Sequence, residues 1–430
     1  MDEAFDAIVV GAGPAGVTTA RELAAAGLSV VVLERGAFPG AKNVWGGILY
    51  RDPTEAMLPG FEAEAPLERP ISEQRYLLLT EDAMMGATYR SQAFATPPYN
   101  AYSVLRSPFD RWHAETAEAA GAEVYSEFTV TDVLWEDGAV VGVTTGDPDG
   151  ELRARCVVLA DGANSLLAQK IGLHAEWAPL DQALVAKELI ALPAEKIEDR
   201  FALERGMGTA LEIFGESTWG LLGYGFVYTN KESVSIGTGA LLGDLIESGR
   251  NVNDMLDRFK RHPAIAPLIQ GGETVEYSAH LIPEGGYDKL PRLFGDGVVV
   301  VGDAAGFVNP LNREGVNLAM LSGKLAAQTI VEAKAADDFS AAALARYREL
   351  LAGSVVFADL KKIRYVTPFA HVRPHLLRDY PQVLSSMLGE YLTVDGTPKG
   401  VKQKKMLGMV ARLPKKRLLG DLAGARKLLG

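Results

Sequence analysis

A glycine-rich turn near the start of the chain has residue types and spacing suited to binding phosphate groups. The run GAGPAG (11–16) directly follows the apolar segment 6–10 and opens a segment of helical character. Gly11 allows a tight turn, Gly13 lets the backbone approach a pyrophosphate, and Gly16 permits close packing of helix on strand. The free N–H groups and partial positive charge of the helix N-terminus favour phosphate. The pattern predicts a strand–turn–helix unit that binds a dinucleotide.

Acidic residues at the ends of further apolar strands extend this prediction. Glu34 ends the strand 29–33, where a carboxylate can accept hydrogen bonds from a ribose diol. Asp161 and Asp303 stand beside glycines in VVLADG and GVVVVGDAAG, again at strand ends. Either Asp alone fits an ordinary turn or cap. Three such motifs in this order favour FAD over NAD, and the single GxGxxG gives no reason to expect a second nucleotide domain.

A long helix expected over 316–334 begins where the flavin ring would lie. Gly315, Val316 and Asn317 open it, and its N-terminal partial positive charge would stabilise an anionic reduced flavin. The small residues 304–306 leave room for a bulky ring system.

The remaining patterns predict an α/β fold with an inserted domain. A helix is expected over 107–120 with Ser107 as its N-cap, and a hairpin around Asp137-Gly138. Segments 224–228 and 233–238 indicate an antiparallel pair, and helices are expected over 252–260 and 341–357. These segments divide into an FAD-binding domain (1–70, 100–174 and 291–340), a substrate domain (71–99 and 175–290) and a helical C-terminal region (341–430).

Composition excludes several classes of protein. The chain has 430 residues, 48% hydrophobic and 23% charged, which are ordinary globular values. Its one cysteine, Cys156, falls short of the roughly four ligands of an iron–sulfur cluster, and the six histidines show no metal-binding spacing. We therefore expect no metal site and read Cys156 as a small buried hydrophobe. No signal peptide or membrane-spanning run is evident, so a cytoplasmic location is expected.

Charge is distributed unevenly. The net charge of −12 argues against a nucleic-acid binder. Residues 399–430 carry ten Lys and Arg against one Asp, a net +9, which leaves −21 for the rest of the chain. In 402–413, five apolar residues share one helical face, with Lys402, Lys405 and Arg412 elsewhere. Basic amphipathic helices suit an anionic membrane surface, here the cytoplasmic face. Helices docked on the acidic body remain the alternative.

The motifs described above, taken in order, resemble those of known flavoproteins. GAGPAG, Glu34, LRSPFDRW, ADG and GDAAG, in this order, resemble FAD oxidoreductases related to p-hydroxybenzoate hydroxylase and geranylgeranyl reductase. GAKNVWGGILY (40–50), KELIALP (187–193) and the segment 262–287 are more similar to the FixC family, related to electron-transfer-flavoprotein:quinone oxidoreductase. The resemblance implies a Rossmann-like FAD-binding domain of the glutathione reductase type and an inserted antiparallel-sheet domain.

The same resemblance implies partners and an activity. Electrons would come from the two-subunit electron-transfer flavoprotein and leave to a membrane quinone, with a small ferredoxin-like subunit in a FixABCX-like complex. The sequence leaves open whether this complex bifurcates electrons. Two alternatives stay open: an enzyme that saturates isoprenoid double bonds on the same fold, and a non-catalytic membrane anchor of the complex.

Site residues follow from the motifs and the resemblance together. By resemblance Arg106 reaches the FAD phosphates or ribose, although an ion pair with Asp110 would also explain it. Gly46 and Gly47 would let the backbone approach the flavin ring, or form a plain turn. A strand of small and aromatic residues would contact quinone, or belong to the core: Gly223, Tyr224, Gly225 and Phe226. The expected FAD contacts are Gly11, Gly13, Pro14, Ala15, Gly16, Glu34, Arg35, Gly46, Gly47, Arg106, Asp161, Gly162, Gly302, Asp303, Gly315, Val316 and Asn317. No acid or base catalyst is assigned.

Overall fold

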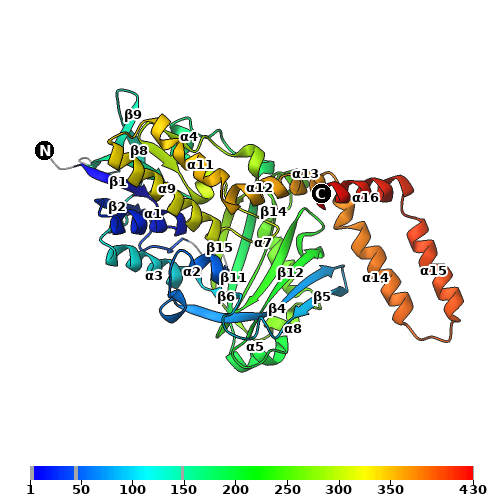
Figure 1. Ribbon diagram of the computed structural model, residues 1–430. Helices are drawn as coiled ribbons and strands as arrows, with labels where there is room; N and C mark the ends of the chain where they lie inside the picture. Colours follow the sequence, from blue (N-terminus) through cyan, green and yellow to red (C-terminus); the bar gives the residue numbers. More distant parts are fainter. Residues whose placement is uncertain (1–3, 43–46, 147–149, 430) are drawn as a thin grey trace.

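The computed structural model describes residues 4–42, 47–146 and 150–429. Two sheets, each with helices packed on it, form the body, and a helical arm projects from it (Figure 1). This is the α/β architecture that the sequence predicts, with a second sheet and a helical C-terminal region.

The first sheet has a parallel centre in the order β17-β10-β1-β2-β7. Buried runs such as VVVLE in β2 are typical of strands covered on both faces. β10 is longer than expected: its first half pairs antiparallel with β9 and its second half parallel with β1 and β17. The strands are β1 (Phe5–Val10), β2 (Val30–Glu34), β7 (Glu123–Ser126), β8 (Val130–Glu136), β9 (Ala139–Thr145), β10 (Glu151–Leu159), β16 (Phe294–Gly295) and β17 (Val298–Val300).

Helices cover this sheet, and two of them approach each other unusually closely. A Cβ on Gly323 of α9 would overlap the carbonyl oxygen of Ala15 in α1, so only glycine fits there. The helices of this part are α1 (Pro14–Ala25), α2 (Arg51–Glu55), α3 (Arg106–Ala119), α4 (Leu166–Lys170), α9 (Val316–Ala336), α10 (Ala341–Leu344), α11 (Arg346–Ala352) and α12 (Val355–Ile363). Short 3-10 turns are η1 (Phe61–Ala63), η4 (Tyr287–Lys289) and η5 (Gly302–Ala305).

Two helix predictions need correction. Ser107 is not an N-cap: α3 begins one residue earlier at Arg106, and no side chain caps it. The helix expected over 341–357 is three short helices, broken at Ala345 and again before Ser354. The Ser354 hydroxyl accepts a hydrogen bond from the N–H of Val356 at 3.2 Å, so it caps a new helix.

The second sheet departs from the expected antiparallel pattern at one pairing. β15, β11, β14, β13 and β12 form an antiparallel ladder, but β12 pairs parallel with β4. β4 crosses the expected boundary at residue 70, and β3 and β6 also join this sheet. The strands are β3 (Ile48–Tyr50), β4 (Leu67–Leu79), β5 (Met84–Arg90), β6 (Ala101–Val104), β11 (Gln182–Ala191), β12 (Gly208–Gly215), β13 (Gly223–Thr229), β14 (Ser233–Leu241) and β15 (Glu273–Pro283).

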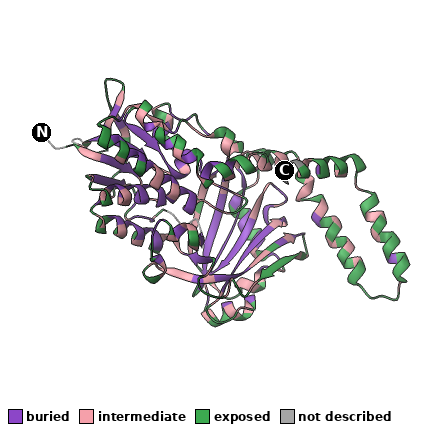
Figure 2. Ribbon diagram, viewed as in Figure 1, coloured by how far each residue is buried: buried purple, intermediate pink, exposed green. Residues whose placement is uncertain are grey.

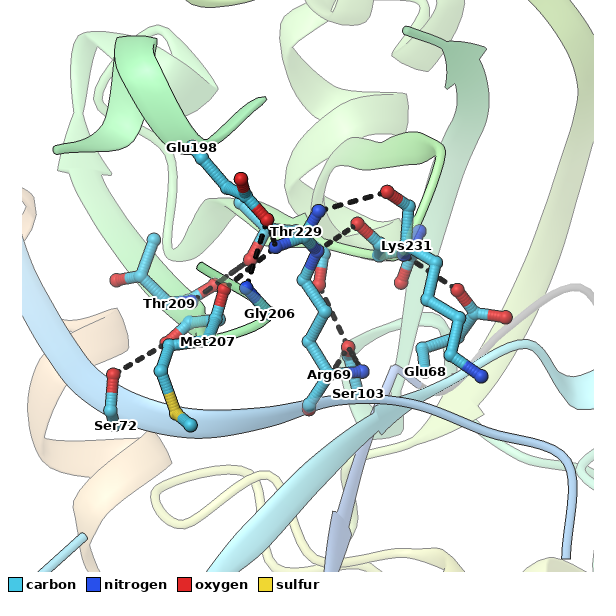
Figure 3. Close-up of polar contacts among 12 residues, drawn as sticks. Glu68, Arg69, Ser72, Ser103, Glu198, Gly206, Met207, Thr209, Thr229 and Lys231 are labelled. Atoms are coloured by element: carbon cyan, nitrogen blue, oxygen red, sulfur yellow. Dashed lines mark hydrogen bonds and ion pairs between the residues drawn. The ribbon is translucent and has the colours of Figure 1, made fainter. Parts of the chain in front are cut away.

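A buried arginine connects the strands of this sheet where β4 changes partner. Arg69 is 2% exposed. Its guanidinium donates to the carbonyls of Asn230 (2.6 Å), Lys231 (2.9 Å) and Met207 (3.0 Å), and pairs with Glu198 at 2.9 Å (Figure 3). One buried side chain thus supplies hydrogen-bond donors to three backbone carbonyls in neighbouring loops.

Helices cover one face of the second sheet, and the other face turns toward the first sheet. Apolar residues such as Ile197, Leu256 and Phe259 pack beneath the sheet. The helices are α5 (Ala194–Phe201), α6 (Leu242–Ser248), α7 (Val252–Arg261) and α8 (Ala266–Ile269), with 3-10 turns η2 (Pro179–Asp181) and η3 (Glu216–Thr218).

The C-terminal region is less uniform than expected. Residues 341–363 pack on the first sheet's core through Leu344, Tyr347 and Leu351, so only later helices lie outside it. These are α13 (Val366–His371), η6 (Pro374–Leu376), α14 (Asp379–Leu392), α15 (Lys399–Ala411) and α16 (Lys415–Leu429). We call 379–429 the arm. Figure 2 shows it largely exposed, with α16 returning toward α13.

Candidate functional site: a cavity at the strand ends

A cavity of about 530 Å³ opens where the parallel strands of the first sheet end. Gly11 follows β1, Glu34 ends β2, Asp161 follows β10, and Asp303 lies in η5 after β17. Ligands of open α/β sheets bind at the carboxyl ends of strands, so the position is the expected one. Residues from the second sheet close the opposite side, among them Phe226 and Tyr228.

The glycine turn is shaped by close contacts on one side and open space on the other. Gly11 has φ +103°, and a Cβ there would lie 2.5 Å from the carbonyl oxygen of Ala160. A Cβ on Gly16 would overlap the carbonyl oxygen of Gly11. By contrast, no atom lies within 4 Å of a Cβ placed on Gly13, which lines the cavity. The turn therefore leaves room for a phosphate group at Gly13.

Glu34 holds this turn in place. Its carboxylate accepts hydrogen bonds from the N–H of Ala12 at 3.0 Å and of Gly36 at 2.6 Å. The side chain also lines the cavity, so a ribose hydroxyl can reach it. The backbone contacts are an additional role that the sequence did not indicate.

Two buried aspartates face the cavity. Burial raises the pKa of Asp303 to about 6, with the Arg106 charge acting in the opposite direction. Burial also raises the pKa of Asp161, partly offset by the N–H of Leu167. Among the described residues, Asp161 Oδ1 has no hydrogen-bond partner although it is fully buried. A ligand hydroxyl would satisfy this atom.

Arg106 combines both roles considered from the sequence. Its guanidinium forms two hydrogen bonds of 2.8 Å with the buried Asp110 carboxylate, and it also lines the cavity. Asp110 thereby fixes the guanidinium at the cavity wall.

Most residues expected to contact the cofactor lie together, and a few do not. Gly16 and Gly302 pack behind the wall, where a Cβ on Gly302 would lie 2.8 Å from the Ala15 Cβ. Asn317 donates to Glu314 at 3.0 Å and does not line the cavity. Gly46 lies outside the described residues. The cavity-lining residues that the sequence predicted are Gly11, Gly13, Pro14, Ala15, Glu34, Arg35, Gly47, Arg106, Asp161, Gly162, Asp303, Gly315 and Val316.

The strand expected to contact quinone is β13, and its residues alternate. Tyr224 and Phe226 line the cavity, whereas Gly225 faces Ser217 and Phe259 on the other side. Gly223 lies at a second cavity beside the first. The alternation is the ordinary two-residue period of a strand.

Several cavity residues gave no sequence signal. Arg313 pairs with Glu212 at 2.8 Å, both buried, and Glu284 lies where the two cavities adjoin. Lys42 was considered from the sequence as a positive charge near the flavin ring and left out of the expected site, but it lines the cavity as well. Each is a lone charged residue in a loop or strand, and only the tertiary fold brings it to the site.

Comparisons with known proteins agree with this geometry. Residues 6–93 and 107–329 match the family model for FAD dependent oxidoreductase, and 366–429 match the ETF-QO/FixC family C-terminal domain. The chain is 46% identical over 410 residues to Protein FixC of Bradyrhizobium diazoefficiens, covering 95% of this chain and 94% of the relative. The chain belongs to the ETF-QO/FixC family.

Two further comparisons support this placement. The probable electron transfer flavoprotein-quinone oxidoreductase YdiS of Escherichia coli is 41% identical over 430 residues, covering 99% of this chain and 100% of the relative. A solved geranylgeranyl bacteriochlorophyll reductase-like protein from Thermoplasma acidophilum shares the fold, with TM-score 0.75, 20% identity and coverage of 98% and 99%.

Family membership establishes the general chemistry. The chain is an FAD-dependent oxidoreductase that acts in electron transfer, as the sequence predicted. The open space at Gly13 and the unpartnered Asp161 oxygen fit this cofactor. Bound FAD supplies two-electron redox chemistry, and this chain holds and orients it.

Proposed function

We propose that this chain accepts electrons from an electron-transfer flavoprotein and passes them to a membrane quinone, within a FixABCX-like complex. The observation that carries the proposal is the match of residues 366–429 to a domain described for the ETF-QO/FixC family, together with the full-length similarity to YdiS. The FAD contacts proposed are the cavity-lining residues given above, supported by Gly16, Gly302 and Asn317 behind the wall. Gly46 stays a proposed contact from the sequence. Whether the complex bifurcates electrons is left open.

A ferredoxin-like subunit is proposed as a separate partner. An iron–sulfur cluster usually needs about four cysteine ligands, and this chain has one. Cys156 is fully buried in β10, where burial raises the pKa of its thiol to about 12. A buried, protonated thiol is a poor metal ligand. Any cluster used in the electron path would therefore have to be carried by another chain.

The arm is proposed to bind the cytoplasmic face of an anionic membrane. Among the described residues, the helices are too short or too polar to cross a membrane. The arm nevertheless exposes large apolar side chains, with Leu407 69% and Leu422 69% exposed. Lysines and arginines accompany them, a combination that suits a lipid surface. Exposed apolar residues on α14, such as Leu388 and Tyr391, were not expected from the sequence.

Two details of the arm differ from the expected amphipathic helices. Lys402 is buried, and its ammonium contacts Asp395 at 3.0 Å and the carbonyl of Thr393 at 2.5 Å, so it closes the turn between α14 and α15. It does not face outward. Asp421 of α16 pairs with Arg373 at 3.0 Å and His375 at 2.8 Å, so α16 is docked on the body while its Leu422 stays exposed.

A second candidate function is reduction of isoprenoid double bonds. The fold shared with the geranylgeranyl bacteriochlorophyll reductase-like protein favours it, but fold alone does not assign a substrate. The third possibility is a non-catalytic membrane anchor. It predicts that the purified protein lacks the yellow colour of bound flavin.

One experiment separates these functions. Purified protein is reduced with dithionite under anaerobic conditions and mixed with a soluble quinone or with a geranylgeranyl lipid. The proposal predicts fast flavin reoxidation by quinone. Reoxidation by the lipid alone would favour the isoprenoid reductase and contradict electron transfer to quinone.

A further inference from the structure

A second cavity, of about 690 Å³, adjoins the cofactor cavity. The two share a wall made of Tyr224, Ile282, Glu284 and Pro310. Both cavities lie on the same face of the second sheet. The cofactor cavity lies where this sheet meets the first sheet, and the second cavity lies where it meets residues 366–378. A molecule in the second cavity would therefore be separated from the first by single side chains.

The second cavity is mostly apolar and reaches the segment that leads into the arm. Apolar side chains from the second sheet, the loop before β13 and the segment 366–378 line it, including Val185, Leu222, Leu241, Val366 and Leu377. Residues 366–378 form one wall and continue directly into α14, the first helix of the arm. An apolar ligand carried by a membrane could thus enter from the arm's side. Such a lining suits an aromatic headgroup with an isoprenoid chain.

Glu284 is the acidic group on the shared wall. It follows β15, and its backbone N–H donates to the carbonyl of Asp181 at 2.7 Å, which fixes its position. Its carboxyl group forms no hydrogen bond or ion pair with the described residues, and the side chain lines both cavities. Burial alone raises the pKa of this carboxyl to about 8. Burial therefore favours the protonated form of this group.

Other titratable groups around Glu284 come from several elements. Tyr224 of β13 shares its wall, and Asp181 of η2 pairs with Lys289 of η4 at 3.6 Å. In the first cavity lie His280 and Arg313, and burial lowers the pKa of His280. The wall of the second cavity also holds Asp244 and His371, 3.3 Å apart, and Glu247, Arg373 and Arg378.

We propose that the second cavity binds the quinone with its headgroup beside Tyr224 and Glu284, and that Glu284 delivers one of the two protons. The proposal rests on the proposed function. Reduction of a quinone to a quinol adds two electrons and two protons. FAD held by the first cavity would supply both electrons when reduced; its own proton would go to solvent, and the second quinol proton would come from solvent through the second cavity. The O–H bond of the Glu284 carboxyl breaks as one quinol O–H bond forms, and the carboxylate regains a proton from solvent through the second cavity.

The test compares Glu284→Gln, which keeps the shape but carries no acidic proton, with Glu284→Asp and with Glu273→Gln. Glu273 is exposed at the other end of β15 and lines neither cavity, so it serves as the matched control. The rate of quinone reduction by the chemically reduced protein is measured against pH, using a water-soluble short-chain quinone. Ferricyanide, which takes electrons without protons, reports on the flavin in each variant.

General acid catalysis contributes roughly 10²- to 10⁴-fold, so Glu284→Gln is expected to slow quinone reduction by about 100-fold or more. Glu284→Asp should recover part of the rate, and Glu273→Gln should match the wild type. The wild-type rate should fall as pH rises through about 8, because the acid is then lost, and Glu284→Gln should lack this fall. An infrared pH titration gives a second readout: a carboxyl band that disappears near the same pH should be absent from Glu284→Gln.

A cavity-filling change tests the binding site separately. Leu222→Trp, on the wall of the second cavity alone, should raise the KM for quinone while FAD stays bound. If the wild type reduces ferricyanide but no quinone, the proposed function is wrong, and the proposed quinone site and role of Glu284 are wrong as well. If the wild type reduces quinone and Glu284→Gln equals it at every pH, the role of Glu284 is wrong. An unchanged KM in Leu222→Trp would place the quinone elsewhere.

Discussion

The carboxylate of Glu34 accepts a hydrogen bond of 3.0 Å from the N–H of Ala12, inside the glycine turn itself. One carboxylate thus orders the phosphate-binding turn and presents acceptors to the cavity. Glu34→Ala should weaken FAD binding by roughly 10- to 100-fold, since hydrogen bonds to charged groups contribute about 1.5–3 kcal/mol. Titration of apoprotein with FAD measures this, with exposed Glu118→Ala on α3 as control. Equal affinities in the two variants would contradict the role of Glu34.

Two glycines of the same turn should respond differently to valine. A side chain on Gly13 would enter open space in the cavity, so Gly13→Val should fold but purify without flavin. A side chain on Gly16 would collide with the Gly11 carbonyl, so Gly16→Val should fail to fold. Circular dichroism and the flavin spectrum separate these outcomes. Full flavin occupancy in Gly13→Val would refute the placement of the pyrophosphate.

The Arg69 network should contribute strongly to stability. Arg69→Met leaves the half-buried Glu198 carboxylate without its ion-pair partner and three carbonyls without this donor, so we expect a loss of about 3–5 kcal/mol, mainly from the carbonyls. Arg153→Met provides the contrast, because Arg153 and Glu136 are both 57% exposed and such pairs contribute about 0–1 kcal/mol. Urea unfolding measures both. Similar small losses in the two variants would show that the network is dispensable.

The arm's apolar residues should be needed for membrane binding. Leu407→Glu combined with Leu422→Glu should reduce co-sedimentation with anionic vesicles while FAD stays bound, because both side chains lie outside the cofactor cavity. Tyr125→Glu, an exposed apolar residue on β7, is the control. High salt should release wild type only in part, since apolar insertion resists screening. Unchanged co-sedimentation of the double variant would end the membrane proposal.

These point changes are preferable to deleting 399–430. The deletion would also remove Asp421, which contacts Tyr380 of α14 and, in the segment beside the second cavity, Arg373 and His375. Loss of flavin or of quinone reduction after such a deletion would then reflect disturbed packing as well as lost membrane contact.

Local patterns predicted the parts of the site that belong to one strand–turn–helix unit. Gly11, Gly13 and Glu34 stand at fixed distances along a βαβ unit, so their spacing in the chain determines their spacing in space. Asp161 and Asp303 could be added because parallel strands bring their carboxyl ends to one edge. The break at Ser354 was missed because apolar spacing continues across it, whereas the serine hydroxyl starts a new helix.

Residues contributed by the second sheet and the C-terminal region could not be predicted in this way. Glu284 and Arg313 reach the cavity only because the fold brings the end of β15 and the loop before α9 to its wall. The parallel pairing of β12 with β4 depends on contacts between segments more than a hundred residues apart. Lys402 looked like a solvent-facing lysine, and the α14–α15 turn that buries it leaves no local pattern.

Electron flow through the whole chain tests the central claim most directly. Reduced electron-transfer flavoprotein is mixed anaerobically with quinone-containing anionic vesicles, with and without a catalytic amount of this protein, and quinol formation is followed. The account predicts quinol formation that requires the protein with FAD bound and is abolished in flavin-free Gly13→Val. Quinol formation at the same rate without the protein, or none with the FAD-loaded wild type, would contradict it.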